Sequence, residues 1–150
     1  MSFATGLLQV PEVYVWTDGS CHPNPGPGGW GAYIQFVGGG ETRLHGAHPD
    51  TTNNQMELTA AIEALQYLYN ERGASTIVVR SDSEYVCNLW GLKPNASPRM
   101  PNWEKWTSLR YAIGLHMDVR FSWVKGHNGD VGNEIADKLA LAGRLSLRSV

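Results

Sequence analysis

The chain has 150 residues, of which 42% are hydrophobic and 17% are charged, and its formal net charge is −2. This composition fits one folded domain over residues 1–150, with a core at about 12–142 and short terminal tails, and excludes a disordered chain. The slightly acidic balance gives no general attraction to nucleic acid, and no apolar run is long enough to cross a membrane.

Three strands are predicted early in the chain, because β-branched and aromatic residues are concentrated there. They cover 12–17, 30–37 and 41–47. Three glycines at 38–40 supply the positive-φ freedom for a tight turn. The second and third strands are therefore expected to form an antiparallel hairpin.

Helices and strands alternate in the rest of the chain. The predicted helices cover 53–72, 83–90, 103–115 and 133–145, and the predicted strands cover 76–80 and 119–124. Asn53 or Asn54 can cap the first of these helices, and Ser83 can cap the second. Residues 91–101 contain three prolines and are expected to be a loop.

This order, βββ-α-β-α-α-β-α, indicates an α/β fold with a five-stranded mixed sheet and helices on both faces. Residues 76–80 are almost continuously apolar, as expected of a buried parallel strand. If this strand lies beside the first one, Asp18 and Asp82 meet at the carboxyl ends of the two strands, where sites form in open α/β sheets.

Four carboxylates lie in distinct local patterns: Asp18 in Thr-Asp-Gly-Ser, Glu57 in Asn-Asn-Gln-Met-Glu-Leu, Asp82 in Ser-Asp-Ser, and Asp137 in Gly-Asn-Glu-Ile-Ala-Asp. Brought together in a low-dielectric pocket, they would repel each other strongly. Hard divalent cations would relieve that repulsion, and oxygen ligands suit Mg²⁺ or Mn²⁺. The hypothesis is a metal-dependent phosphoryl-transfer site.

Two other sites are weighed and set aside. Cys21-His22 could supply zinc ligands, but no second Cys/His pair is near in sequence, so Cys21 and Cys87 are expected to be reduced thiols of a cytoplasmic protein. The glycines of 26–31 satisfy G-x-G-x-x-G, but a strand follows them, whereas a dinucleotide fingerprint opens a helix. Residues 1–11 lack a basic n-region, so no secretory signal is expected.

Taken together, these motifs resemble ribonuclease H of type 1 over roughly residues 12–142. The segments that carry the resemblance are Thr17–Gly29, Thr51–Leu58, Ser81–Val86, and Trp123–Gly129 with Gly132–Asp137. Each alone is weak evidence, but four in this order and spacing are highly specific.

The resemblance implies cleavage of the RNA strand of an RNA–DNA hybrid, leaving 5′-phosphate and 3′-hydroxyl ends. The four acids would be ligands of two Mg²⁺ ions about 4 Å apart, with Asp18 bridging both and Mn²⁺ as a possible substitute. His127 matches a histidine of a mobile loop that assists proton transfer or product release. Substrate contacts are implied as well: Asn24, Asn53 and Asn54 to the RNA strand, and Thr52 and Tyr85 to DNA phosphate and sugar.

Two departures from the family pattern concern substrate binding. The basic helix and loop of well-studied members are short here, with only Lys93 and Arg99 between Trp90 and Trp103, so weaker hybrid binding is expected. At least two of Trp90, Trp103 and Trp106 are expected to pack in the core. Asp50 replaces an arginine that helps to bind phosphate in some relatives.

Two other functions share this fold. One is a non-catalytic hybrid-binding domain, which the retention of all four acids disfavours. The other is a junction resolvase or integrase core, against which the Asn-Asn-x-x-Glu and Gly-His-Asn-Gly patterns argue. The expected partner is an RNA–DNA hybrid, without a membrane, and the expected state is a monomer.

Overall fold

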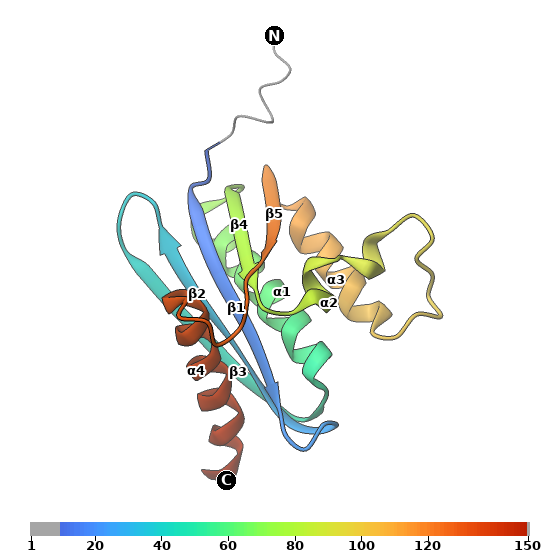
Figure 1. Cartoon of the computed structure of the whole chain (residues 1–150). Helices are drawn as coiled ribbons and strands as arrows, with labels where there is room; N and C mark the ends of the chain where they lie inside the picture. The colour runs from blue at the N-terminus through green and yellow to red at the C-terminus, as the bar shows by residue number, and fades with distance from the viewer. Residues whose placement is uncertain (1–9, 150) are drawn as a thin grey trace.

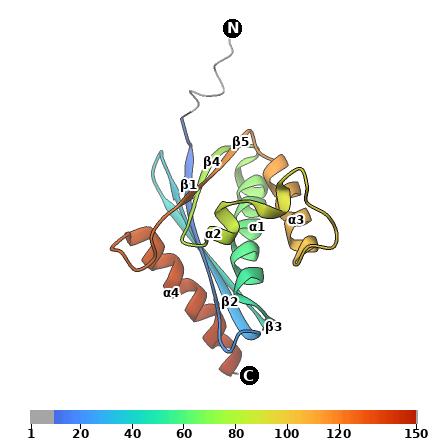
Figure 2. The same ribbon diagram turned by 45° about the vertical axis from the view of Figure 1, so that its right-hand side comes forward.

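The structure is a computed structural model that describes residues 10–149. A five-stranded sheet carries helices on both faces (Figures 1 and 2). The strands are β1 (Val13–Cys21), β2 (Gly26–Phe36), β3 (Glu41–Thr51), β4 (Thr76–Ser81) and β5 (Asp118–Trp123). The helices are α1 (Asn53–Arg72), α2 (Glu84–Cys87), α3 (Trp103–Gly114) and α4 (Val131–Ser146), with 3₁₀ turns η2 (Trp90–Leu92) and η3 (Leu147–Ser149). Most of the expected N-terminal tail lies outside the described residues.

The strand order is β3-β2-β1-β4-β5, which confirms the mixed five-stranded sheet. β1, β2 and β3 pair antiparallel, whereas β4 pairs parallel with both β1 and β5. The parallel pairing of β1 with β4 runs from Val13↔Ile77 to Thr17↔Ser81. Asp18 and Asp82 each follow this last pair directly, so the two acids are neighbours at the same edge, as predicted.

The first strand is longer than predicted. Asp18 does not end it, because β1 continues to Cys21 and pairs with the glycine-rich start of β2 through Asp18↔Gly31 and Cys21↔Gly28. Glycine has low strand propensity, so the sequence pattern concealed this extension. A Cβ built on Gly31 would lie 2.6 Å from the Ala136 carbonyl oxygen of α4, so the missing side chain lets the helix approach the sheet.

Alternate residues of β1 face two cores. Val13 and Val15 belong to the larger core, which joins the sheet to α1 and α3. Trp16 faces α4 and forms a smaller cluster with Tyr33 and Ala136. Helices therefore cover both faces, with α1 and α3 on one and α4 on the other, as expected (Figure 2).

Two details of the helices differ from expectation. The cap of α1 is Thr52, whose side chain accepts a hydrogen bond from the backbone N–H of Gln55; Asn53 and Asn54 are the first helical residues. Glu57 consequently lies at the start of the second turn rather than in the first. Ser83 caps α2 as predicted, but that helix ends at Cys87.

Candidate active site

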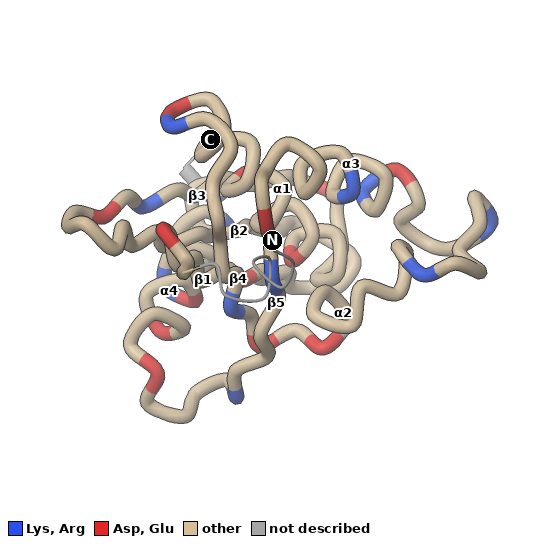
Figure 3. The backbone as a smooth tube through the Cα atoms, turned by 90° about the horizontal axis from the view of Figure 1, so that it is seen from above, with Lys and Arg blue, Asp and Glu red and all other residues tan. Residues whose placement is uncertain are grey.

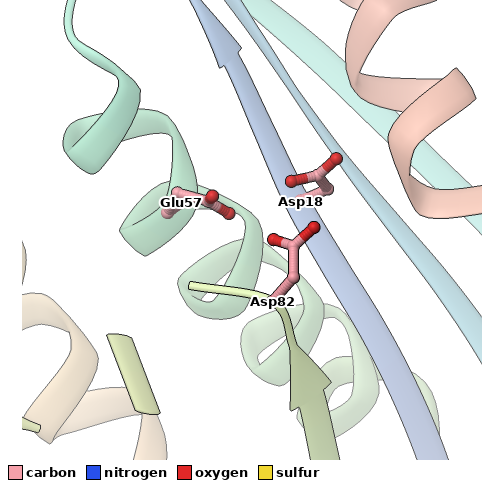
Figure 4. A group of neighbouring side chains, drawn as sticks. All are labelled: Asp18, Glu57 and Asp82. Carbon is pink, nitrogen blue, oxygen red and sulfur yellow. The ribbon is translucent and has the colours of Figure 1, made fainter. Parts of the chain in front are cut away.

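Three carboxylates converge where the parallel pairing of β1 with β4 ends. Asp18 comes from β1, Glu57 from α1, and Asp82 from the residue after β4 (Figure 4). Each offers an oxygen, and these oxygens all lie within 4.8 Å of one another. Asp18 and Glu57 are only 5% and 8% exposed. The structure thus brings together three of the four predicted acids as a compact, largely buried group.

Gly19 explains how Glu57 reaches this position. A Cβ built on Gly19 would lie 2.6 Å from the backbone nitrogen of Glu57 and 2.9 Å from the Cβ of Met56. Any side chain there would push the start of α1 away from β1. The Thr-Asp-Gly pattern therefore supplies one acid of the group and also the space that a second acid needs.

The charges in this group are not balanced by a nearby cation. Burial, followed by the charge of Asp82 and a hydrogen bond with Asp137, raises the pKa of Asp18 to about 8. Burial, followed by the charges of Asp18 and Asp82, raises the pKa of Glu57 well above its usual range. Within residues 10–149, the ion pairs are Arg43–Glu41 and Arg120–Asp118, and neither involves these acids.

The fourth acid, Asp137, lies beside Asp18 but outside the compact group of three. It comes from α4, and its carboxyl group is hydrogen-bonded to that of Asp18. Asp18 therefore contacts acids from two helices on opposite faces of the sheet. The charge of Asp137 also contributes to the raised pKa of Asp18.

Two residues that the sequence interpretation did not assign hold Asp82 in place. The Asn133 side chain donates to Asp82 Oδ2 at 3.3 Å, and the Trp123 indole N–H donates to the Asp82 backbone carbonyl at 3.1 Å. Asn133 is itself fixed at the start of α4, where its backbone N–H donates to Asp130. Asn133 lies one helical turn before Asp137, and this spacing is the sequence feature that could have identified it.

The donor set fits a divalent metal ion. Glu57 Oε1 is buried and has no hydrogen-bond partner among the described residues. A buried carboxylate oxygen without a partner is costly unless something binds it. Three clustered carboxylate oxygens are the ligand chemistry that Mg²⁺ and Mn²⁺ prefer. Asp18, Glu57 and Asp82 would hold such an ion, with Asp137 beside Asp18.

The predicted loop histidine lies between β5 and α4. His127 is exposed and adopts a left-handed backbone conformation, with φ of 55°. Its neighbour Gly126 passes so close to the site that an added Cβ would lie 2.8 Å from Asp82 Oδ2. The backbone of this loop is thus adjacent to the acids, while the His127 side chain faces solvent.

The three predicted RNA-contacting asparagines lie together near the start of α1. Asn24, in the β1–β2 loop, accepts a hydrogen bond at 3.2 Å from the backbone N–H of Asn53. The side chains of Asn24, Asn53 and Asn54 are all exposed. Thr52 also lies here, but its hydroxyl is engaged in capping α1.

Tyr85 is tethered by a hydrogen-bond network that the sequence interpretation missed. Its hydroxyl accepts from the Asn102 side chain and from the Trp106 indole N–H, both at 3.0 Å. Asn102 in turn accepts at 3.2 Å from Gln55 in α1. The network links α1, α2 and α3 beside the acids. Asn102 lies directly before α3, and its side chain bonds within this network instead of capping the helix.

A cavity of about 560 Å³ adjoins this network, lined by Gln55, Asn102, Trp103 and Lys105 among others. The expectation that at least two of the three tryptophans pack in the core is wrong. Trp106 is fully buried, Trp103 is half-buried at the cavity, and Trp90 is 52% exposed beside Lys93. The short segment between Trp90 and Trp103 leaves these two indole rings only partly covered.

Comparison with known proteins agrees with this geometry. The family model for RNase H matches residues 11–144. The chain is 42% identical to a protein named Ribonuclease H from Gluconobacter oxydans, an alignment that covers 98% of this chain and 100% of that protein.

Solved structures share the fold. The RNase H1 from Halobacterium salinarum has a TM-score of 0.74 at 27% identity, covering 92% of this chain and 98% of that one. LC11-RNase H1, solved in complex with RNA/DNA hybrid, has a TM-score of 0.75 at 24% identity, covering 91% and 99%. No helix in the described part of this chain is long and apolar enough to span a membrane.

Proposed function

The chain belongs to the ribonuclease H family, and we propose that it cuts the RNA strand of RNA–DNA hybrids internally, leaving 5′-phosphate and 3′-hydroxyl ends. The observation that carries this proposal is the largely buried group of Asp18, Glu57 and Asp82, whose oxygens lie within 4.8 Å of one another. The unpartnered Glu57 Oε1 within that group is best explained by a bound cation.

The activity depends on a divalent cation, and we propose two Mg²⁺ ions, with Mn²⁺ as a substitute. Asp18 is suited to bridge them because it contacts both the Glu57–Asp82 pair and Asp137. When bound, such ions activate a water molecule and stabilise the leaving oxygen of a phosphodiester. Burial of Asp18 and Glu57 keeps bulk water from competing with the substrate, and Asn133 fixes the orientation of Asp82.

His127 is proposed to assist proton transfer or product departure. Its loop is anchored beside Asp82 at Gly126, while the imidazole is exposed and accessible to a bound substrate. Gly129 in the same loop has a φ of 83°, a backbone conformation that glycine adopts without a steric cost. These features support a proton carrier that approaches the reacting phosphate only when substrate is bound.

Recognition of a hybrid requires one surface for 2′-hydroxyls and another for deoxyribose. We propose that Asn24, Asn53 and Asn54 contact the RNA strand, since short exposed amides can donate and accept. Thr52 and Tyr85 are proposed to contact the DNA strand, and the network around Tyr85 fixes the distance between the two surfaces. We further propose that residues 1–150 act as one domain, as a monomer, in the cytoplasm.

A cleavage assay tests the proposal. A labelled RNA–DNA hybrid is incubated with the protein beside matched RNA and DNA duplexes, with Mg²⁺ or with EDTA. We expect internal cuts in the RNA of the hybrid only, and only with the metal. Asp18→Asn should abolish turnover while the fold is kept, and Glu63→Gln should not, because Glu63 is an exposed acid of α1. Binding without cleavage by the wild-type protein would favour a non-catalytic hybrid-binding domain.

A further inference from the structure

Part of the sheet beside the active site is left uncovered by α4. That helix packs on β1, β2 and β3, whereas β4 and β5 extend past it on the same face (Figures 1 and 2). The strand register aligns Arg80 of β4 with Trp16 of β1 and Ser122 of β5. Arg80 therefore projects from the face that carries Trp16 and Asp18, and it is half-buried, between the buried Val79 and Ser81.

The Arg80 guanidinium lies over two aromatic rings. Its guanidinium carbon lies 4.9 Å from the Tyr14 ring centre and 5.4 Å from that of Trp16. Stacking of this kind orients the planar group and leaves the N–H donors at its edge able to bind a phosphate in bidentate fashion. The pre-organised cation loses little conformational entropy when an anion binds.

Two further cations extend this surface. Arg120 lies on β5, and the exposed Lys125 lies on the connection from β5 to α4, which crosses the same side of the sheet (Figure 1). Asp118 is the one acid on the two strands, and its carboxylate pairs with Arg120 at 2.9 Å. The tube view shows Lys and Arg along both strands and the connection (Figure 3). Arg80, Arg120 and Lys125 together form what we call the β4–β5 surface, with a net positive charge.

The β4–β5 surface lies next to the reacting phosphate but away from the DNA contacts. Arg80 precedes Asp82 by two residues, which is roughly 7 Å along a strand. Tyr85, the proposed DNA contact, packs with the core on the opposite face of the sheet, against α3. The strand that passes over the acids is the RNA strand, so RNA is the strand that can reach Arg80.

We propose that the β4–β5 surface binds phosphates of single-stranded RNA that continues from the hybrid past the active site. This inference rests on the proposed function and deepens it: the substrate is a hybrid whose RNA strand carries a single-stranded tail. Arginine stacked on aromatic rings beside other cations is a chemistry that single strands favour. Such a contact would also strengthen substrate binding in a chain whose basic insertion is short.

The test compares three forms of one hybrid core. The first is blunt, the second carries an unstructured single-stranded tail on the RNA strand at one end or the other, and the third carries the same tails on the DNA strand. Values of kcat/KM and of KM are measured with Mg²⁺ over a range of salt concentrations. Binding is measured by fluorescence anisotropy in the Asp18→Asn background. Arg80→Gln is the test variant. Arg43→Gln is the matched control, since Arg43 is stacked on Tyr33 at 5.4 Å in the same way, but on the distant strand β3.

We expect an RNA tail to lower KM for the wild-type protein. Arg80→Gln should reduce that gain about threefold or more, and should flatten the slope of log affinity against log salt concentration by about 0.7. Arg43→Gln should keep the gain. The proposal would be overturned if an RNA tail had no effect on the wild-type protein, or if a DNA tail gave an equal gain. Cleavage of the blunt hybrid in such an experiment would still support the proposed function. Arg80→Lys retains the charge but loses the planar fork, so it should keep the salt slope and only part of the gain. If it loses as much as Arg80→Gln, the effect comes from packing on Tyr14 and Trp16, and the proposal fails.

Discussion

Replacing Asp18 by asparagine is expected to stabilise the metal-free protein while abolishing its activity. The carboxylate is 5% exposed, and burial together with neighbouring acids raises its pKa from 3.8 to about 8. Between these two values the folded protein holds a proton that the unfolded chain has released. The free energy of unfolding therefore falls as pH rises through this window, and the loss is complete above about pH 8.

The size of this effect follows from the two pKa values. Each pH unit between them is worth about 1.4 kcal/mol, so the difference of about four units sets an upper limit of roughly 6 kcal/mol. Asparagine keeps the shape and carries no charge, so it should recover about 2–5 kcal/mol at pH 8, equivalent to roughly 5–15 °C in the melting temperature. At pH 4 the two proteins should melt at similar temperatures.

The assay is thermal unfolding in EDTA from pH 4 to pH 9, repeated with excess Mg²⁺. Glu63→Gln, at an exposed acid of α1, controls for the general loss of a negative charge. Wild-type protein should regain stability with Mg²⁺, and Asp18→Asn should regain much less. The reasoning is refuted if the difference in melting temperature between wild type and Asp18→Asn does not grow with pH, or if Mg²⁺ stabilises both equally.

Three further changes test other parts of the structure. Gly19→Ala should lower kcat at least about tenfold and destabilise the protein by about 1–3 kcal/mol, because the added Cβ collides with the Glu57 backbone. Gly38→Ala is the control and should do neither, because Gly38 lies in open space. Equal effects of the two variants in kinetics and urea unfolding would contradict this account. Tyr85→Phe removes the acceptor of two donors, one of them on the buried Trp106, and should cost about 1–3 kcal/mol. It should raise KM for the hybrid without lowering kcat. Unchanged KM and stability would show that the network does not position the ring. Burial raises the pKa of Cys87 to about 11, so its alkylation in the folded protein should be slow at pH 8 and accelerate towards pH 11. The urea-unfolded protein is the control and should react fast at pH 8. An equally fast reaction of the folded protein at pH 8 would disprove this.

Both the site and the fold were largely predictable from local patterns. The four acids lie in short motifs whose spacing is tied to strand ends and helix starts, so their convergence followed once β1 and β4 were taken as parallel neighbours. The glycine-rich extension of β1 and β2 was missed because glycine gives no strand signal, although here it serves the close approach of α4. The cap of α1 was misplaced by one or two residues, since threonine and asparagine are both good caps.

The surroundings of Tyr85 and Arg80 were less predictable, because they depend on contacts between residues far apart in sequence. Gln55 and Asn102 are 47 positions apart in sequence, and only the packing of α3 on α1 joins them into the network that holds Tyr85. The stacking of Arg80 on Tyr14 and Trp16 likewise depends on strand pairing that no local pattern records.

The sequence by itself determined which acids can bind a metal and on which elements they lie. These properties depend on residue type and short spacing, which the chain states directly. The tertiary structure alone decided that Asp18, Glu57 and Asp82 form a tight group with Asp137 beside it, and that Glu57 is left with an unpartnered oxygen. Distances, burial and the resulting pKa values arise only when separate elements pack together, because the repulsion between buried charges depends on how close the fold brings them.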